Sequence, residues 1–283
     1  MRKNTMIKSI TTCIILLLTA SLLSCSENKQ PAWIKPDTYT ISCGEYYSHE
    51  TPLGILNNNV WNKHAADTDS WEQCLEMRSI DGNTQYGWSW SWPFGRRVIY
   101  SQPQIKIGAS PWAPEPKFND AFPIKISELT EFTVNHELEV YSNGNHNNVT
   151  TMWLLTQAYH GSKPRPDLIA VEVMIWTYAT PAHFDPAGKK YSELTIGDSI
   201  WEVWYEKDWN DKSGVNDNQW ISLSYRADES SMSATIPALK LLQFAISEGL
   251  INDELFIADI ELGNEVMSGS GIAWVREFSV AVH

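Results

Sequence analysis

The chain has few basic residues, and its histidines form no recognisable ligand pattern. Its 21 lysines and arginines are outnumbered by 34 acidic residues, which gives a formal net charge of −13. Because a nucleic acid partner needs cations that neutralise its phosphates, this balance argues against one. No two histidines have a spacing typical of paired metal ligands, so we expect neither a metal site nor a cofactor.

Long apolar runs are also scarce, and the one present lies at the N-terminus. Basic residues precede an apolar stretch over residues 10–23 that is too short for a membrane-spanning helix. This pattern is typical of an export signal. The sequence Leu22-Leu23-Ser24-Cys25 resembles a bacterial lipobox, in which cleavage leaves Cys25 as the lipidated first residue. We therefore expect a signal peptide over 1–24, a lipidated tether over 25–36 and one domain over 37–283. An ordinary cleaved signal with an incidental cysteine is the alternative.

Cysteine is nearly absent from the rest of the chain. Cys13 falls in the signal and Cys25 carries lipid, which leaves Cys43 and Cys74 as an even pair in an oxidising compartment. A disulfide that closes a loop of roughly 30 residues is the natural interpretation, and two buried free thiols are the alternative. Glu27, soon after the lipidated cysteine, resembles a surface-export signal of some Gram-negative lipoproteins. We expect a monomer in the cell envelope, anchored to the outer membrane.

Most of the chain alternates apolar and polar residues in short runs broken by Gly, Pro, Asn and Asp. This pattern is typical of an all-β sandwich or barrel, and the length suits one large domain. One segment, from Pro237 to Leu250, has apolar residues at spacings of three and four and predicts a helix packed on the outer sheet. The clearest expected strands lie at 105–107, 132–134, 171–176, 201–205, 220–225 and 256–262.

Two glutamates lie in unlike settings. In the expected strand 171–176, alternation places valine and isoleucine side chains toward the core and Glu172, Met174 and Trp176 on the opposite face. A carboxylate between a thioether and an indole lies on a cleft wall rather than in open solvent. Glu265 follows the last expected strand and shares the face of Glu172 if no bulge intervenes.

Three tryptophans alternate within one expected strand. Trp88, Trp90 and Trp92 would project from a single face, with only serines between them. Any one of them is more often a core residue, but three in alternation are harder to bury together. Aromatic rings stack on the apolar faces of pyranose rings, so we expect Trp88 and Trp90 to line a glycan groove.

Three motifs, in order along the chain, resemble those of one enzyme family. Asn58-Asn59-Val60-Trp61 is similar to a groove segment, Val171-Glu172-Val173-Met174-Ile175-Trp176 to a nucleophile strand, and Gly263-Asn264-Glu265-Val266 to an acid/base segment. The family is glycoside hydrolase family 12, the endo-β-1,4-glucanases and xyloglucanases with a β-jelly-roll fold. The resemblance extends from about residue 43 to the C-terminus. Cysteines 43 and 74 bracket the groove segment, as an N-terminal disulfide does in several members.

The resemblance implies two antiparallel sheets with a concave cleft, and a retaining endo-acting hydrolase of β-1,4-glucans. Glu172 would be the nucleophile and Glu265 the acid/base, with their carboxyl groups about 5 to 5.5 Å apart. Substrate contacts are expected from Asn59, Trp61, Met174 and Trp176, in addition to Trp88 and Trp90. Asp259 and Glu261 are the rivals for the acid's role.

The sequence departs from the family pattern at one place. The family commonly has an aspartate on a strand next to the nucleophile, whereas the corresponding stretch, 148–153, has no carboxylate. The competing hypothesis is therefore a non-catalytic, surface-anchored glycan-binding lipoprotein with the same groove. The two intact glutamate motifs favour the enzyme.

Overall fold

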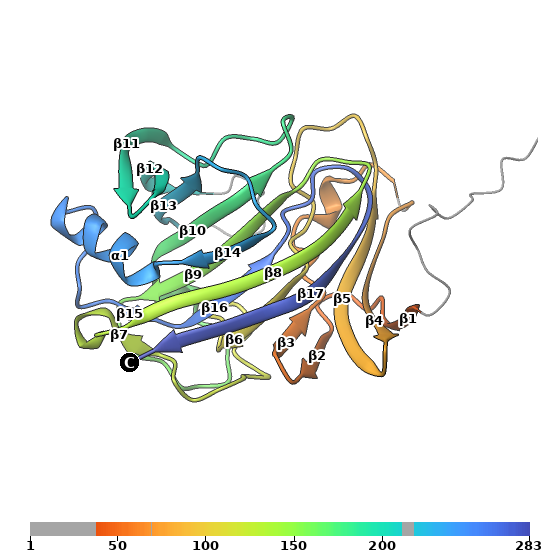
Figure 1. The fold of residues 1–283 in the computed structure, drawn as a ribbon, viewed down its shortest axis with the longest axis horizontal. Helices are drawn as coiled ribbons and strands as arrows, with labels where there is room; N and C mark the ends of the chain where they lie inside the picture. The colour runs from red at the N-terminus through yellow and green to blue at the C-terminus, as the bar shows by residue number, and fades with distance from the viewer. Residues whose placement is uncertain (1–37, 69, 211–217) are drawn as a thin grey trace, which may run out of the picture. The chain divides into compact units, whose positions relative to one another are not determined.

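A computed structural model describes residues 38–68, 70–210 and 218–283. In this part the chain forms two β-sheets that pack face to face (Figure 1), which confirms the expected all-β sandwich. The expected signal peptide, Cys25 and the tether over 25–36 lie outside the described residues. Among the described helices, none is long and apolar enough to cross a membrane.

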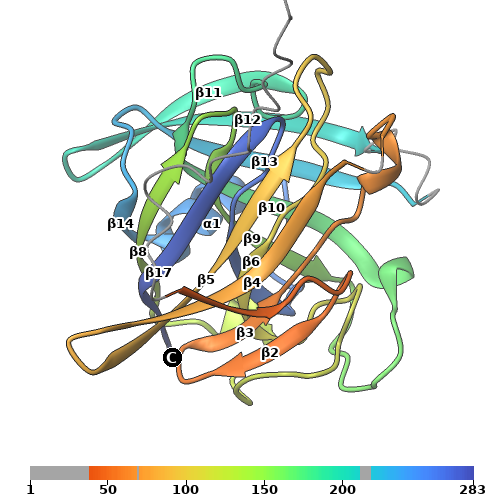
Figure 2. The same ribbon diagram turned by 90° about the vertical axis from the view of Figure 1, so that its right-hand side faces the viewer.

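The first sheet is antiparallel throughout (Figure 2, where its strands lie in front). Its strands occur in the order β1 (Thr38–Ser42), β4 (Glu72–Ile80), β5 (Asn83–Trp92), β17 (Gly269–Val282), β8 (Phe132–Ser142) and β14 (Ser233–Ile236).

The second sheet is larger and contains one parallel pair, β10 and β13. This pair departs from the expected antiparallel sheets because the chain leaves β10, forms the β11–β12 hairpin and returns beside β10 in the same direction. The order is β11 (Lys189–Ile196), β12 (Ser199–Trp209), β13 (Trp220–Ala227), β10 (Ile169–Ala179), β9 (Asn147–Leu155), β16 (Asp259–Gly263), β6 (Gln104–Gly108), β3 (Gly54–Asn57) and β2 (Ser48–Thr51), with β7 (Ile124–Lys125) and β15 (Phe256–Ile257) paired alongside.

The main core lies between the sheets, and the expected helix covers one end of it. Helix α1 (Ala238–Ser247) buries Leu241, Leu242 and Ala245 and contacts β8 of the first sheet. The Tyr225 hydroxyl on β13 donates a hydrogen bond to the Leu241 carbonyl at 2.7 Å, which joins the helix to the second sheet. Short 3₁₀ turns complete the structure at Lys63–Ala65, Ile126–Glu128 and Pro166–Leu168.

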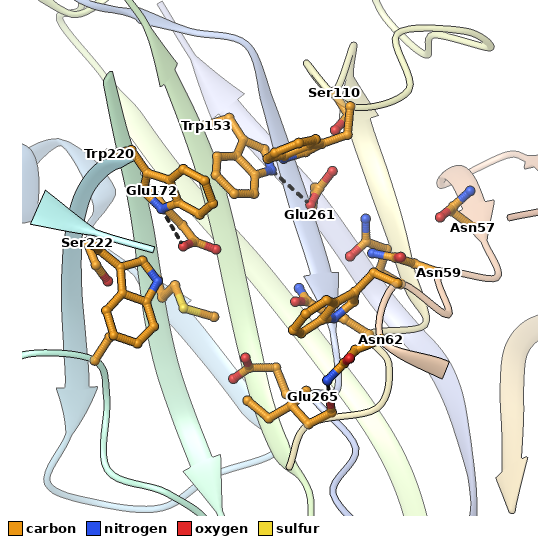
Figure 3. A pocket seen from close by; sticks show the side chains of 18 of the residues that line it. Asn57, Asn59, Asn62, Ser110, Trp153, Glu172, Trp220, Ser222, Glu261 and Glu265 are labelled. Atoms are coloured by element: carbon orange, nitrogen blue, oxygen red, sulfur yellow. Dashed lines mark hydrogen bonds between the residues drawn. The ribbon is translucent and has the colours of Figure 1, made fainter. Parts of the chain in front are cut away.

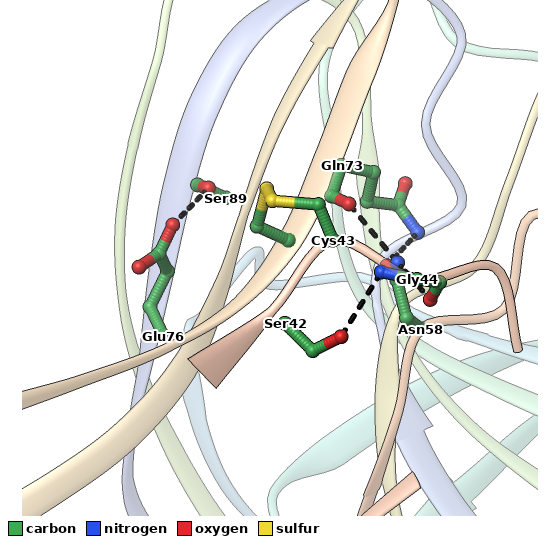
Figure 4. Close-up of a disulfide and its surroundings, with 8 residues drawn as sticks. Ser42, Cys43, Gly44, Asn58, Gln73, Glu76 and Ser89 are labelled. Carbon is green, nitrogen blue, oxygen red and sulfur yellow. Dashed lines mark hydrogen bonds between the residues drawn. A yellow bond between two sulfur atoms is a disulfide. The ribbon is translucent and has the colours of Figure 1, made fainter. Parts of the chain in front are cut away.

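The expected disulfide between Cys43 and Cys74 is present and joins the segment after β1 to β4 (Figure 4). Beside it, Asn58 Nδ2 donates to the carbonyls of Gly44 at 2.9 Å and Gln73 at 3.0 Å. The Gln73 amide donates in return to Asn58 Oδ1 at 2.9 Å. The disulfide and these bonds fix the loop that follows β3 and leads into the functional site.

Candidate active site

A cleft of about 670 Å³ lies on the face of the second sheet that points away from the core. Strands β3, β6, β9, β10, β13 and β16 contribute alternate residues to this face, while the residues between them enter the core. Figure 3 shows Glu172, Glu261 and Glu265 directed into the cleft. Its volume is typical of a ligand site.

Glu172 lies on the cleft face of β10, as the strand alternation predicts. Val171 and Val173 on either side are fully buried in the core, whereas Glu172 is only partly buried. The indole N–H of Trp220 donates a hydrogen bond to Glu172 Oε2 at 2.9 Å (Figure 3). The carboxylate therefore has both access to the cleft and a fixed donor from the neighbouring strand.

Glu265 lies in the loop between β16 and β17 and is 7% exposed. Asn147 at the start of β9 holds it twice: Nδ2 donates to Glu265 Oε2, and Oδ1 accepts from the Glu265 backbone N–H at 2.8 Å. Burial raises the pKa of Glu265 from its usual 4.5 to about 7, and the Asn147 hydrogen bond opposes this rise. Glu265 is thus mostly protonated at mildly acidic pH and still about half protonated near neutral pH, as a general acid requires.

Two buried histidines flank Glu265 without adding charge. His146 pairs with Val266, and His183 packs edge-on against Trp176 with ring centres 5.0 Å apart. Burial lowers the pKa of each histidine to about 4, so both are neutral at neutral pH. Neither ring offers a cation that would favour an ionised Glu265.

Four of the expected groove residues line the cleft, namely Asn59, Trp61, Met174 and Trp176. Trp176 and Met174 follow Glu172 along β10 at intervals of two, and the other two lie on the loop after β3. The loop also places Asn62 in the wall, where Asn62 Nδ2 donates to the Ile99 carbonyl at 2.7 Å.

The expectation that Trp88 and Trp90 line the groove is wrong. Both lie on β5 of the first sheet and point into the core, where they are 0% and 3% exposed. Trp88 donates its indole N–H to Asn264 Oδ1 at 2.9 Å, so it supports the loop of the acid candidate from the core side. Trp90 covers Gly271 on the paired strand, where a Cβ atom would meet the indole ring at 2.2 Å. The glycine opposite thus provides the space into which the Trp90 ring packs.

The aromatic wall comes instead from three tryptophans on other segments. Trp112, Trp153 and Trp220 all line the cleft and pack edge to face, with ring centres 5.6 to 5.9 Å apart. Sequence reasoning missed them because they lie far apart along the chain. One signal was available for Trp220: it alternates with a serine at 222 on the expected strand 220–225, which indicates that both lie on the face away from the core.

A cluster of three titratable residues, Lys106, Asp259 and Glu261, lies beside this wall. Lys106 Nζ donates to the Ala113 carbonyl at 2.6 Å, and the Trp153 indole donates to Glu261 Oε2 at 3.3 Å. Burial lowers the pKa of Lys106, and the charges of Glu261 and Asp259 oppose this. Burial, and then the nearby Glu261 charge, hold the pKa of Asp259 well above its usual value. Of the two rivals for the acid's role, Glu261 lines the cleft, whereas Asp259 is fully buried and does not line it.

Comparisons with known proteins decide the family. Residues 52–283 match the family model described as glycosyl hydrolase family 12. The chain belongs to this family. It is 27% identical to Endoglucanase S of Pectobacterium parmentieri over 80% of this chain and 81% of that one.

Solved structures of other family 12 enzymes have the same fold as this chain. A family 12 xyloglucanase from Bacillus licheniformis superposes with a TM-score of 0.70 and 20% identity, over 87% of this chain and 100% of that one. Endoglucanase 3 from Trichoderma harzianum superposes with a TM-score of 0.68 and 16% identity, over 88% of this chain and 99% of that one. The chain is therefore a glycoside hydrolase of the endoglucanase and xyloglucanase family, which acts within β-glucan chains.

In this enzyme, strand β9, which lies next to the expected nucleophile strand β10, has no carboxylate on its cleft face. β9 flanks β10, and Trp153 is the residue opposite Glu172 in the register. Two positions earlier, Thr151 stands on the same face and accepts a hydrogen bond from Gln102 Nε2 at 3.3 Å. The stretch 148–153 is therefore part of the adjacent strand, and on this face it presents the Thr151 hydroxyl and the Trp153 indole instead of a carboxylate.

Proposed function

We propose that the enzyme hydrolyses the β-1,4-linked backbone of glucans, such as xyloglucan, mixed-linkage glucan or cellulose-like chains, with retention of configuration. The observation that carries the proposal is the pair of unlike carboxyl groups in one cleft. Glu172 is accessible and accepts an indole N–H, whereas Glu265 is buried with a pKa of about 7. Acid-assisted glycoside hydrolysis requires two carboxyl groups whose environments separate their protonation states, and membership of family 12 supports its double-displacement form.

In the first step, an oxygen of the ionised Glu172 carboxylate attacks the anomeric carbon. The bond from that carbon to the glycosidic oxygen breaks, and Glu265 donates its proton to the departing oxygen. In the second step, the Glu265 carboxylate removes a proton from water, the water oxygen attacks the anomeric carbon, and Glu172 is released. The aromatic wall of Trp112, Trp153 and Trp220 provides apolar surfaces on which sugar rings stack.

The test is to measure reducing ends released from xyloglucan, mixed-linkage β-glucan and carboxymethylcellulose. We expect turnover of at least one polymer by the wild type and none by Glu172→Gln, which should still bind that polymer in affinity electrophoresis. Substantial turnover by Glu172→Gln would exclude Glu172 as the nucleophile. Binding without turnover by the wild type would favour the non-catalytic glycan-binding protein.

We also propose that the enzyme is a monomer held at the outer membrane through lipid on Cys25. The lipobox-like sequence before this cysteine supports the proposal, and two or more acyl chains give stable anchoring. In cell fractionation, the wild type should sediment with membranes, whereas Cys25→Ala should be released into the soluble fraction. Equal release of both proteins would rule out the anchor.

A further inference from the structure

The donor to Glu172 comes from a residue that neither the sequence motifs nor the family resemblance brings forward. Trp220 is the first residue of β13, which pairs in parallel with β10 so that Ser222 is opposite Glu172. Trp220 and Ser222 lie on the same face, and the indole reaches diagonally to Glu172 Oε2 at 2.9 Å. Trp220 is 5% exposed and Glu172 is partly buried, so the donor side of this bond is covered while the carboxylate still reaches the cleft.

The chemistry of an indole suits one task at this position. An indole N–H donates a hydrogen bond and cannot accept one, and it has no accessible pKa. It therefore favours the ionised carboxylate over the protonated acid at every working pH, without competing for the proton. A carboxyl neighbour would instead share a proton with Glu172 and make its charge depend on a second titration.

The orientation of the Trp220 ring is fixed by its neighbours. Trp112 and Trp153 meet it edge to face, with ring centres at 5.9 Å and 5.7 Å. The N–H is consequently held in place before substrate binds, and little ordering is required when charge shifts at Glu172.

The neighbouring tryptophan makes a different bond and provides a matched comparison. Trp153 lies opposite Glu172 on β9, yet its N–H donates to Glu261 Oε2 at 3.3 Å. Trp153 and Trp220 thus share one aromatic cluster and each serves a different carboxylate (Figure 3). The other titratable residues that line the described part of the cleft are Tyr46, Arg97, Lys106, Asp185, Glu261 and Glu265, and the buried Asp259 interacts with Glu261.

We propose that Trp220 is the positioning residue of the nucleophile: its indole N–H fixes one oxygen of Glu172 and favours the ionised form. The inference rests on the proposed function, in which Glu172 attacks the anomeric carbon. On this account the nucleophile is supported by an uncharged donor from β13. Positions 151 and 153 of β9, on the other side of β10, carry no carboxylate.

The experiment uses dinitrophenyl 2-deoxy-2-fluoro-β-cellobioside on the full chain. Glu172 forms an ester bond to the anomeric carbon while dinitrophenolate leaves with the electron pair. Because this leaving group needs no proton, Glu265 drops out and the pH dependence of inactivation reports the nucleophile alone. In Trp220→Phe, which keeps an aromatic ring but lacks the N–H, the acid limb should move up by about one pH unit, and inactivation at pH values below the wild-type limb should slow about tenfold.

Trp153→Phe is the matched control. It removes an N–H from the same cluster and should leave the acid limb of inactivation in place, even where binding of the probe weakens. An unchanged limb in Trp220→Phe, or an equal shift in Trp153→Phe, would overturn the inference. If Trp220→Phe does not fold, 3-benzothienylalanine at position 220 keeps the bicyclic shape without the N–H and gives the same readout. Failure of the wild type to be labelled on Glu172, checked by peptide mass spectrometry, would instead contradict the proposed function.

Discussion

Glu265 should reduce the stability of the folded enzyme above neutral pH, and Glu265→Gln should remove that cost. Burial raises the pKa of Glu265 from 4.5 to about 7. The folded state therefore holds this proton more tightly than the unfolded chain, and the free energy of unfolding falls as pH rises from about 4.5 toward 7. A shift of this size corresponds to about 3 kcal/mol at pH 8, at 1.36 kcal/mol per pKa unit. Glutamine carries no such cost, and its side-chain oxygen can still accept from Asn147.

The assay is urea unfolding of both proteins at pH 5 and pH 8. We expect Glu265→Gln to gain less than about 1 kcal/mol at pH 5 and about 3 kcal/mol at pH 8. The buried histidines His136, His146 and His183, whose pKa values burial lowers to about 4, titrate in both proteins and cancel in the difference. An equal gain at the two pH values would refute the argument that burial holds Glu265 protonated.

Two further changes test the supports of the site. Replacing Cys43 and Cys74 together with serine should lower the free energy of unfolding by about 3 to 4 kcal/mol, since the bridge closes a separation of 31 residues; a loss below about 1 kcal/mol in urea unfolding would contradict this. Asn147→Ala should move the basic limb of kcat/KM up by about one pH unit, because ionised Glu265 loses its donor. A limb that stays or moves down would show that Asn147 does not tune the acid.

Local patterns predicted the parts of the site that depend on one strand. The period of two in β10 was enough to put Glu172, Met174 and Trp176 in the cleft, because one strand presents alternate residues to opposite faces whatever its partners are. The same rule placed the tryptophans of β5 on one face. It could not say that this face belongs to the core of the first sheet, and the groove role of Trp88 and Trp90 was therefore wrong.

The remainder of the site depends on which strands become neighbours. Trp220 lies beside Glu172 because β13 returns to β10 in parallel after a hairpin, and Trp112 joins Trp153 through a loop after β6. Pairings between distant segments leave no periodic signal in the residues themselves. The buried Lys106 next to Glu261 is a second such case, because β6 and β16 are more than 150 residues apart and meet only in the folded sheet.

Azide rescue of Glu265→Ala tests the division of roles between the two glutamates most directly. With a dinitrophenyl β-cellobioside, Glu172 still forms the glycosyl-enzyme, but the carboxylate that activates water in the wild type has been removed. Azide needs no base, so it should restore turnover and yield a β-glycosyl azide, identified by NMR. An α-glycosyl azide would contradict retention, and unchanged turnover of the variant without azide would contradict the acid/base role of Glu265.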